Sequence, residues 1–200
     1  FPPTHALLEE SWRLYLAAME QLLAEQPWLL GDRFTVADAS AYGQLSMNLV
    51  DPTSAATLEQ YAPRTFRWLL AIREGGHRDS AGELVVSPAL QPLLAIIMQT
   101  FAPLMVQNER ACMRAFEAGE TLFNEAAFDA GVALYDGELM GHPFRSVVKT
   151  FQVRVWRELC GQWRGLDEAA RGELEQILPD AHLLQGSDEA PGLTSWSGRR

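Results

Sequence analysis

Cysteine, positive charge and long apolar runs are all scarce in this chain. Its two cysteines, Cys112 and Cys160, lie far apart and form no CxxC motif, which predicts reduced thiols in a cytoplasmic protein rather than a disulfide framework. Only 16 Lys and Arg residues face 26 Asp and Glu residues, which gives the 200-residue chain a formal net charge of -10. An acidic surface repels phosphate backbones, so we expect no nucleic-acid partner.

The chain also lacks the motifs of membrane insertion, metal binding and nucleophilic catalysis. Its most apolar stretch, residues 90–106, is interrupted by Pro92, Gln99 and Pro103, which predicts no membrane-spanning helix. The 4 histidines show no HxxxH spacing, so no metal site is expected. The sequence contains no G-x-S-x-G elbow and no glycine-rich phosphate loop. It therefore displays no catalytic constellation of its own.

Helical periodicity dominates what is present. Residues 4–26 predict an amphipathic helix that Pro27 ends, because their apolar side chains recur every three or four positions. These side chains are Leu8, Trp12, Tyr15, Leu16, Met19, Leu22 and Leu23. Further helices are expected at 35–49, at 88–118, at 144–163 and from about 167 to 178. The apolar face of the helix at 144–163 is expected to hold Phe144, Val148, Phe151, Val155 and Leu159.

One short β element interrupts the helical pattern. Asp136-Gly137 is a strong hairpin signal, and short β-prone stretches flank it. We therefore expect a small β-hairpin near 132–141 within an all-α fold.

Residues 30–45, LGDRFTVADASAYGQL, carry the most distinctive local signal. Thr35 and Asp38 have the spacing of a capping box, in which each side chain pairs with a backbone N–H that the first helical turn leaves free. Small residues follow, namely Ala37, Ala39, Ser40, Ala41, Gly43 and Ser46. Small side chains let neighbouring helices approach closely, so this helix is expected to be central and buried. Both capping residues are predicted to act in folding rather than in chemistry.

This stretch resembles the C-terminal, all-helical domain of the glutathione transferase superfamily. The resemblance is carried by Pro27-Trp28-Leu29-Leu30-Gly31-Asp32 and Phe34-Thr35-Val36-Ala37-Asp38, and it continues through Tyr42, Gly43, Leu45 and residues 62–69. It covers residues 4–73 and implies a helical bundle of that family's C-terminal type. The remainder is similar to a C-terminal extension of some bacterial members, through Phe101-Ala102-Pro103, Asn108, Pro143-Phe144-Arg145 and Lys149.

The resemblance also implies a division of the chain. A glutathione-transferase C-terminal-like core is expected at 1–76, a loop at 77–87 and a helical extension at 88–184, followed by a disordered tail at 185–200. Family members carry an N-terminal thioredoxin-like domain that holds glutathione and supplies a catalytic Tyr, Ser or Cys. Nothing before Thr4 can supply that domain, so we expect a fragment whose catalytic residue lies in the missing part.

Three aromatic residues are candidates for substrate binding. Trp12, Tyr15 and Tyr42 are expected to line the apolar pocket in which the family holds its electrophilic substrate. The alternative is core packing, because aromatic side chains at helical spacing are usually core residues.

A proline inside a predicted helix marks a second candidate surface. Pro103 should kink its helix and free the carbonyl of Gln99. Gln99, Asn108 and Arg110 are then candidates for contact with a ligand. The alternative is an exposed polar face on a helix that bends around the core.

A third candidate is a positive stripe that would contact an anion. Arg145, Lys149 and Gln152 have the i, i+4, i+7 spacing of one helical face in an otherwise acidic chain. The alternative is a solvated face that pairs with acidic neighbours, as charged stripes usually are.

The leading hypothesis, implied by the resemblance, is the helical, electrophile-binding part of a glutathione-transferase-like protein. Joined to its thioredoxin-like domain, it would conjugate or reduce small hydrophobic electrophiles with glutathione as co-substrate, as a cytoplasmic homodimer. The alternative is a non-catalytic binding or dimerisation module of the same fold. A third hypothesis is an unrelated helical ligand-binding protein in which the capping box is coincidental. An intact thioredoxin-like domain upstream would favour the enzyme over the module.

Overall fold

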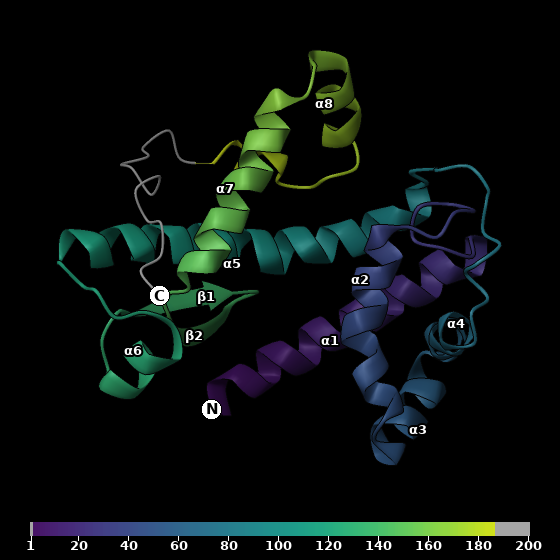
Figure 1. The fold of residues 1–200 in the computed structure, drawn as a ribbon, viewed down its shortest axis with the longest axis horizontal. Helices are drawn as coiled ribbons and strands as arrows, with labels where there is room; N and C mark the ends of the chain where they lie inside the picture. Colours follow the sequence, from purple (N-terminus) through teal and green to yellow (C-terminus); the bar gives the residue numbers. More distant parts are fainter. Residues whose placement is uncertain (1, 187–200) are drawn as a thin grey trace. The chain divides into compact units, whose positions relative to one another are not determined.

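The computed structural model describes residues 2–186, which fall into two compact units. The described residues of the first unit are 2–101, 138–144 and 176–179, and those of the second unit are 102–137, 145–175 and 180–186. Helices predominate in both units (Figure 1), and a two-stranded sheet is present. The predicted all-α fold with a small hairpin is therefore confirmed. The tail predicted at 185–200 lies almost entirely outside the described residues.

Four α-helices and the start of a fifth build the first unit. They are α1 (Pro2–Glu25), α2 (Val36–Leu45), α3 (Pro52–Tyr61), α4 (Pro63–Arg73) and the first part of α5 (Gln91–Glu117), with the 3-10 helices η1 (Ser46–Leu49) and η2 (Pro88–Leu90). Helix α4 packs against α1 and α3, and η1 carries the chain from α2 to α3. The core residues between them include Leu16, Met19, Leu22, Leu45, Leu58, Trp68, Leu69 and Ile72.

The N-terminus of α4 is capped by a side chain from another helix. Its own N-cap residue, Ala62, has no side-chain acceptor, and Pro63 occupies the first turn. Glu20 of α1 supplies the acceptors instead: Oε1 accepts from the Thr65 backbone N–H at 2.7 Å, and Oε2 accepts from the Arg64 N–H at 3.1 Å. A carboxylate at this end also faces the positive end of the helix dipole. The contact joins α1 to α4 with a polar anchor beside the apolar core.

The capping box predicted at Thr35 and Asp38 is present. Asp38 Oδ2 accepts from the Thr35 backbone N–H at 2.9 Å and from the Thr35 hydroxyl at 2.8 Å, while Thr35 Oγ1 accepts from the Ala37 N–H at 3.2 Å. The other oxygen, Oδ1, accepts from the backbone N–H of Leu29 at 2.8 Å. Asp38 is fully buried, so these donors replace the water that its carboxylate loses on folding. One side chain thus holds both the start of α2 and the turn that follows α1.

That turn also pairs with the predicted loop at 77–87. The Asp32 N–H donates to the Glu83 carbonyl at 3.1 Å, and the Val85 N–H donates to the Leu30 carbonyl at 3.0 Å. Gly31 lies between them with a φ of 92°, and a Cβ at this position would sit 2.9 Å from the Glu83 oxygen. Only glycine fits this backbone conformation and this close approach.

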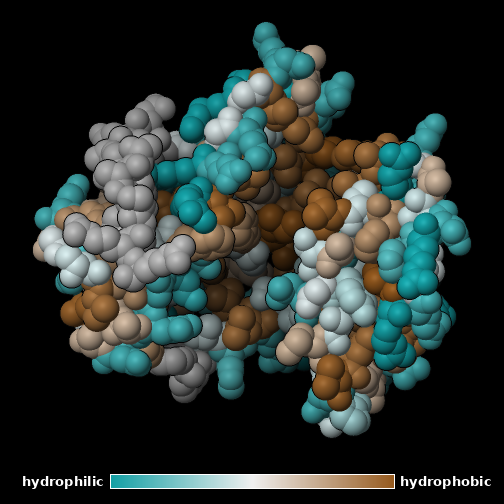
Figure 2. Space-filling view, in the orientation of Figure 1, coloured by the Kyte–Doolittle hydropathy of each residue, from teal (hydrophilic) through white to brown (hydrophobic). Residues whose placement is uncertain are grey.

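Helix α2 is shorter and more exposed than predicted. It ends at Leu45 and continues as the 3-10 helix η1, and only Asp38 and Leu45 are buried along it. Val36 is 81% exposed and Met47 73% exposed, and apolar side chains are visible over α2 and α3 (Figure 2). The expectation of a central, buried helix is therefore wrong for the described residues. Its small side chains leave one face uncovered because no described element packs there.

The second unit combines helices with the hairpin. It contains the rest of α5, α6 (Asn124–Ala130), β1 (Leu134–Leu139), β2 (His142–Val147), α7 (Thr150–Gly165), α8 (Glu168–Glu175) and the 3-10 helix η3 (Ala181–Gln185), with residues 138–144 of the hairpin grouped in the first unit. The hairpin turn is Met140-Gly141, and the predicted turn pair Asp136-Gly137 lies inside β1. Both turn residues have positive φ, 51° and 77°, as a two-residue hairpin turn of type I′ requires.

Helix α7 starts later than predicted and buries a different face. Residues 144–147 belong to β2, and the helix begins at Thr150. Its buried side chains are Val153, Trp156, Cys160 and Trp163. Phe151, Val155 and Leu159, which were predicted to share the apolar face of this helix, are exposed. The helix carries two apolar stripes, and packing rather than periodicity decides which one is buried.

Helix α5 has the length and hydropathy of a membrane span. Residues Pro88–Glu117 meet both criteria with a mean hydropathy of 1.6, although the sequence predicted no such helix. The helix continues through Pro103, and 33% of its most apolar 18-residue window is buried. Buried side chains along the helix include Leu93, Met98 and Met105. Its C-terminal half also buries Asn108 and Glu109 against protein partners, which suits a protein interior better than lipid.

Replacing Asp38 by alanine is expected to lower the free energy of unfolding by about 2–4 kcal/mol. The change removes a helix cap and leaves the buried Leu29 N–H without its acceptor. Urea denaturation followed by circular dichroism measures the loss. Asp79→Ala, at an exposed loop position, is the control and should change stability by less than about 0.5 kcal/mol. Equal stability of the two variants would contradict the role assigned to Asp38.

Candidate functional site

A pocket of about 340 Å³ opens between α1 and α3 in the first unit. Its apolar wall is formed by Trp12 and Leu16 of α1 and Leu58 of α3. The remaining lining residues are Glu9, Arg13, Ala17, Asn48, Ser54, Thr57 and Tyr61. Leu16 and Leu58 are buried and Tyr61 is 70% exposed, so the lining extends from the core to the surface. Its volume is at the lower end of the range for small-molecule sites.

The polar side chains Glu9, Arg13, Asn48 and Ser54 of this pocket form hydrogen bonds within the protein. Arg13 Nη2 donates to Glu9 Oε1 at 2.6 Å, so the two charges at the rim neutralise each other. Asn48 Oδ1 accepts from the Ser54 hydroxyl at 2.8 Å, and Asn48 Nδ2 donates to the Leu45 carbonyl at 2.9 Å. The pocket therefore offers an apolar wall, the aromatic rings of Trp12 and Tyr61, and no net charge. That combination favours a small neutral apolar ligand.

The structure brings one of the three predicted aromatic residues to this pocket. Trp12 lines it, whereas Tyr15 and Tyr42 do not. Tyr15 stacks on Trp12 with ring centroids 6.4 Å apart, and both it and Tyr42 pack partly buried against the core of the first unit. Burial raises the pKa of the Tyr15 hydroxyl above its usual value, so the group is un-ionised at neutral pH.

The two predicted amide side chains near Pro103 lie in different environments. Gln99 is exposed in the first unit. Asn108 is 1% exposed in the second unit, where its Oδ1 accepts from the Lys149 N–H at 2.9 Å and its Nδ2 donates to the Lys149 carbonyl at 3.0 Å. Both ends of the Asn108 amide are therefore used to fix the residue that precedes α7.

The predicted positive stripe is not a helical face. Arg145 lies in β2, Lys149 is the N-cap of α7, and only Gln152 lies within that helix. The prediction of one shared face is wrong, because the hairpin extends to Val147 and delays the helix. Arg145 forms a two-pronged ion pair with Asp136 at 2.7 and 2.9 Å, and this hydrogen bonding lowers the pKa of Asp136 below its usual value.

The capping box and the α1–α3 pocket lie in one segment that a family comparison identifies. Residues 2–71 match the family described as Glutathione S-transferase, C-terminal domain. This segment is a glutathione S-transferase C-terminal domain. No curated protein and no solved structure matches the chain in the corresponding comparisons. Every residue that lines the α1–α3 pocket belongs to the glutathione S-transferase C-terminal domain, whereas the chain from residue 72 onward lies outside the match.

Sequence reasoning missed most of this pocket. Asn48, Ser54 and Tyr61 come from η1 and α3, far along the chain from Trp12. The available signal was Asp51-Pro52, which caps α3 through a hydrogen bond from the Ser54 N–H to Asp51 Oδ1 at 2.8 Å. It fixes where α3 begins, but it does not tell which helix lies opposite. Within residues 2–186, no group of three His, Cys, Asp or Glu side chains is placed to hold a metal ion.

Neither cysteine of the chain offers an activated nucleophile. Burial raises the pKa of Cys112 to about 11, against the opposing effect of Arg157. Burial likewise raises the pKa of Cys160 to about 11, with a further contribution from Glu109. A thiol with such a pKa is protonated at neutral pH, and sulfur attacks as the thiolate. These cysteines therefore pack the second unit rather than perform chemistry.

Both thiols are expected to resist an aromatic disulfide reagent at neutral pH in the folded protein. Burial blocks access and keeps the sulfur protonated, so labelling should be at least about a hundredfold slower than in the unfolded chain. Absorbance of the released thiolate measures the rate. The same chain in guanidinium chloride is the control, in which both cysteines should react promptly. Rapid labelling of either one in the folded protein would contradict this assignment.

Proposed function

We propose that this chain is the helical, electrophile-binding part of a glutathione-transferase-like protein. Joined to a thioredoxin-like domain, the protein conjugates or reduces small electrophiles with glutathione. The observation that carries the proposal is a neutral apolar pocket inside the segment that matches the family. A pocket of about 340 Å³ has room for a small aromatic electrophile, with its ring against Trp12.

Under this proposal each of the two domains binds one of the two reactants. The thioredoxin-like domain holds glutathione and lowers the pKa of its thiol, which produces the nucleophile. This chain binds the electrophile on Trp12, Leu16 and Leu58 and excludes water from one side of it. The proposed setting is a homodimer in the cytoplasm, consistent with two reduced thiols in the chain.

A second candidate is a binding or dimerisation module of the same fold without catalysis. Two observations favour it. Both cysteine thiols are buried and inactive, and α2 with η1 exposes Val36 and Met47 to solvent. An exposed apolar helix face is a usual feature of surfaces that meet a partner protein.

The test is glutathione-dependent turnover of chlorodinitrobenzene by the natural protein that carries this chain. We expect turnover, and we expect Ala17→Trp to raise the KM at least about tenfold, because the new ring fills the α1–α3 pocket. Ala126→Trp, at an exposed position of α6, is the matched control and should leave the kinetics unchanged.

The outcomes separate the two candidates. Turnover that Ala17→Trp does not affect would overturn the assignment of the electrophile to this pocket. Absence of turnover, with binding of neutral phenylnaphthylamine that Ala17→Trp abolishes, would overturn the enzyme and support the binding module.

A further inference from the structure

A groove of about 560 Å³ lies between α5 and η3, within the second unit. One face of α5 forms one wall, and residues 182–186 form the other. Val106 and Met113 on α5 and Leu183 on η3 give it an apolar floor, and each of the three is half-buried. The groove is larger than the α1–α3 pocket and lies outside the matched segment, so nothing about it depends on the proposed function.

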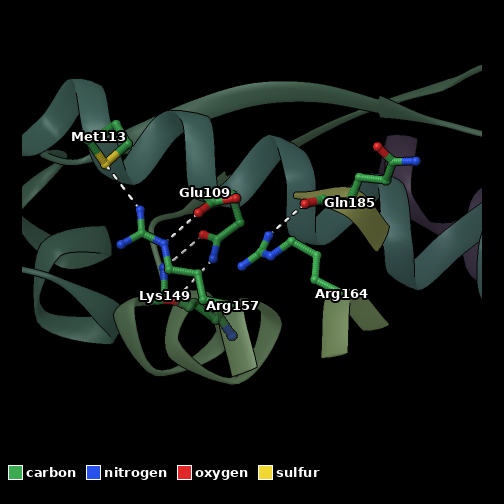
Figure 3. Close-up of polar contacts among 7 residues, drawn as sticks. Glu109, Met113, Lys149, Arg157, Arg164 and Gln185 are labelled. Carbon is green, nitrogen blue, oxygen red and sulfur yellow. Dashed lines mark hydrogen bonds and ion pairs between the residues drawn. The ribbon is translucent and has the colours of Figure 1, made fainter. Parts of the chain in front are cut away.

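The buried carboxylate of this groove, Glu109, is neutralised by an ion pair with Arg157. Glu109 is 5% exposed, and its Oε1 accepts from Arg157 Nε at 2.5 Å. Arg157 Nη2 also lies 3.4 Å from the sulfur of Met113, which lines the groove (Figure 3). Because the Glu109 charge is paired, an anion entering the groove meets little repulsion from it.

Two cations of the groove have no such partner. Arg110 and Arg114 are exposed and lie one helical turn apart on α5, and neither forms an ion pair within residues 2–186. Besides Glu109, the other lining residues that can carry charge are Glu117, about one turn beyond Arg114, and His182, whose Nδ1 is 4.0 Å from an Asp180 oxygen. With Glu109 paired to Arg157, the lining keeps two arginines against one carboxylate, that of Glu117, in a chain of net charge -10.

The wall opposite the arginines is fixed in place. Arg164 Nη1 of α7 donates to the Gln185 carbonyl at 2.6 Å (Figure 3). Gly186 packs so closely on α7 that a Cβ there would lie 3.2 Å from the Cβ of Cys160. These contacts hold η3 at its distance from α5, and a preformed groove costs little ordering when a ligand binds.

We propose that the α5–η3 groove binds a small amphipathic anion. The apolar body of the ligand lies on Val106, Met113 and Leu183, and its carboxylate or sulfonate is bound by Arg110 with Arg114 at its side. Arginine suits this role because its planar guanidinium donates two parallel hydrogen bonds to such groups. The neutral α1–α3 pocket and this cationic groove therefore select ligands of different charge.

The test compares two dyes that differ in one group. Anilinonaphthalene sulfonate carries the anion, and phenylnaphthylamine is the same molecule without the sulfonate. In titrations of the whole 200-residue chain followed by dye fluorescence, we expect Arg110→Gln to weaken sulfonate binding about tenfold and to leave phenylnaphthylamine affinity unchanged. Arg67→Gln, an exposed arginine of α4, is the matched control and should change neither affinity.

A second variant tests the groove by shape. Val106→Trp should fill it and weaken sulfonate binding at least about tenfold, whereas Ala17→Trp in the α1–α3 pocket should not. Circular dichroism confirms that each variant folds, and Arg114→Gln replaces either groove variant that does not. The proposal is overturned if the wild-type chain does not bind the sulfonate dye, or if the folded groove variants bind it as the wild type does. It is equally overturned if Arg67→Gln weakens binding as much as Arg110→Gln.

Discussion

The buried carboxylate of Asp38 is the interaction on which the first unit depends. Its two oxygens accept hydrogen bonds from Leu29 on one side and from Thr35 on the other. An ionised carboxylate without these donors would be costly to bury, so the turn and the helix start form together or not at all. The turn sets the direction in which the chain leaves α1, and α2 and η1 then lead to α3. Asp38 thus contributes to the placement of α3, one wall of the α1–α3 pocket, together with α4, which packs against both α1 and α3.

The second unit uses the same physical device between α5 and α7. Asn108 holds the backbone of Lys149, and Glu109 pairs with Arg157, so adjacent polar residues of α5 fix the start and the middle of α7. This anchoring leaves the neighbouring α5 residues Arg110 and Arg114 free to face the groove. Helix α5 therefore carries both kinds of residue: Asn108 and Glu109 hold α7, and Arg110 and Arg114 give the groove its cations.

Local signals predicted the local structure and failed where packing decides. The spacing of Thr35 and Asp38 was sufficient for the capping box, because both partners lie within one helical turn. Helix α7 carries two apolar stripes, and nothing in its sequence tells whether Val153 or Val155 is buried. The hairpin register is a similar case, since two glycine-containing pairs compete and burial of Leu139 and Val147 favours the turn at Met140-Gly141. The α1–α3 pocket is lined by residues of separate helices, so no local sequence pattern predicted it.

Charge and burial together define what this chain contributes to chemistry. A thiol with a pKa of about 11 supplies almost no thiolate at neutral pH, and bringing Cys112 or Cys160 to the surface would open the core of the second unit. A sulfur nucleophile must therefore arrive from outside this chain if the proposed function holds. Under the proposed function, this chain selects the other reactant. The Glu9–Arg13 pair leaves the α1–α3 pocket neutral, whereas Arg110 and Arg114 leave the α5–η3 groove positive, so the same ligand body would be directed by the charge it carries.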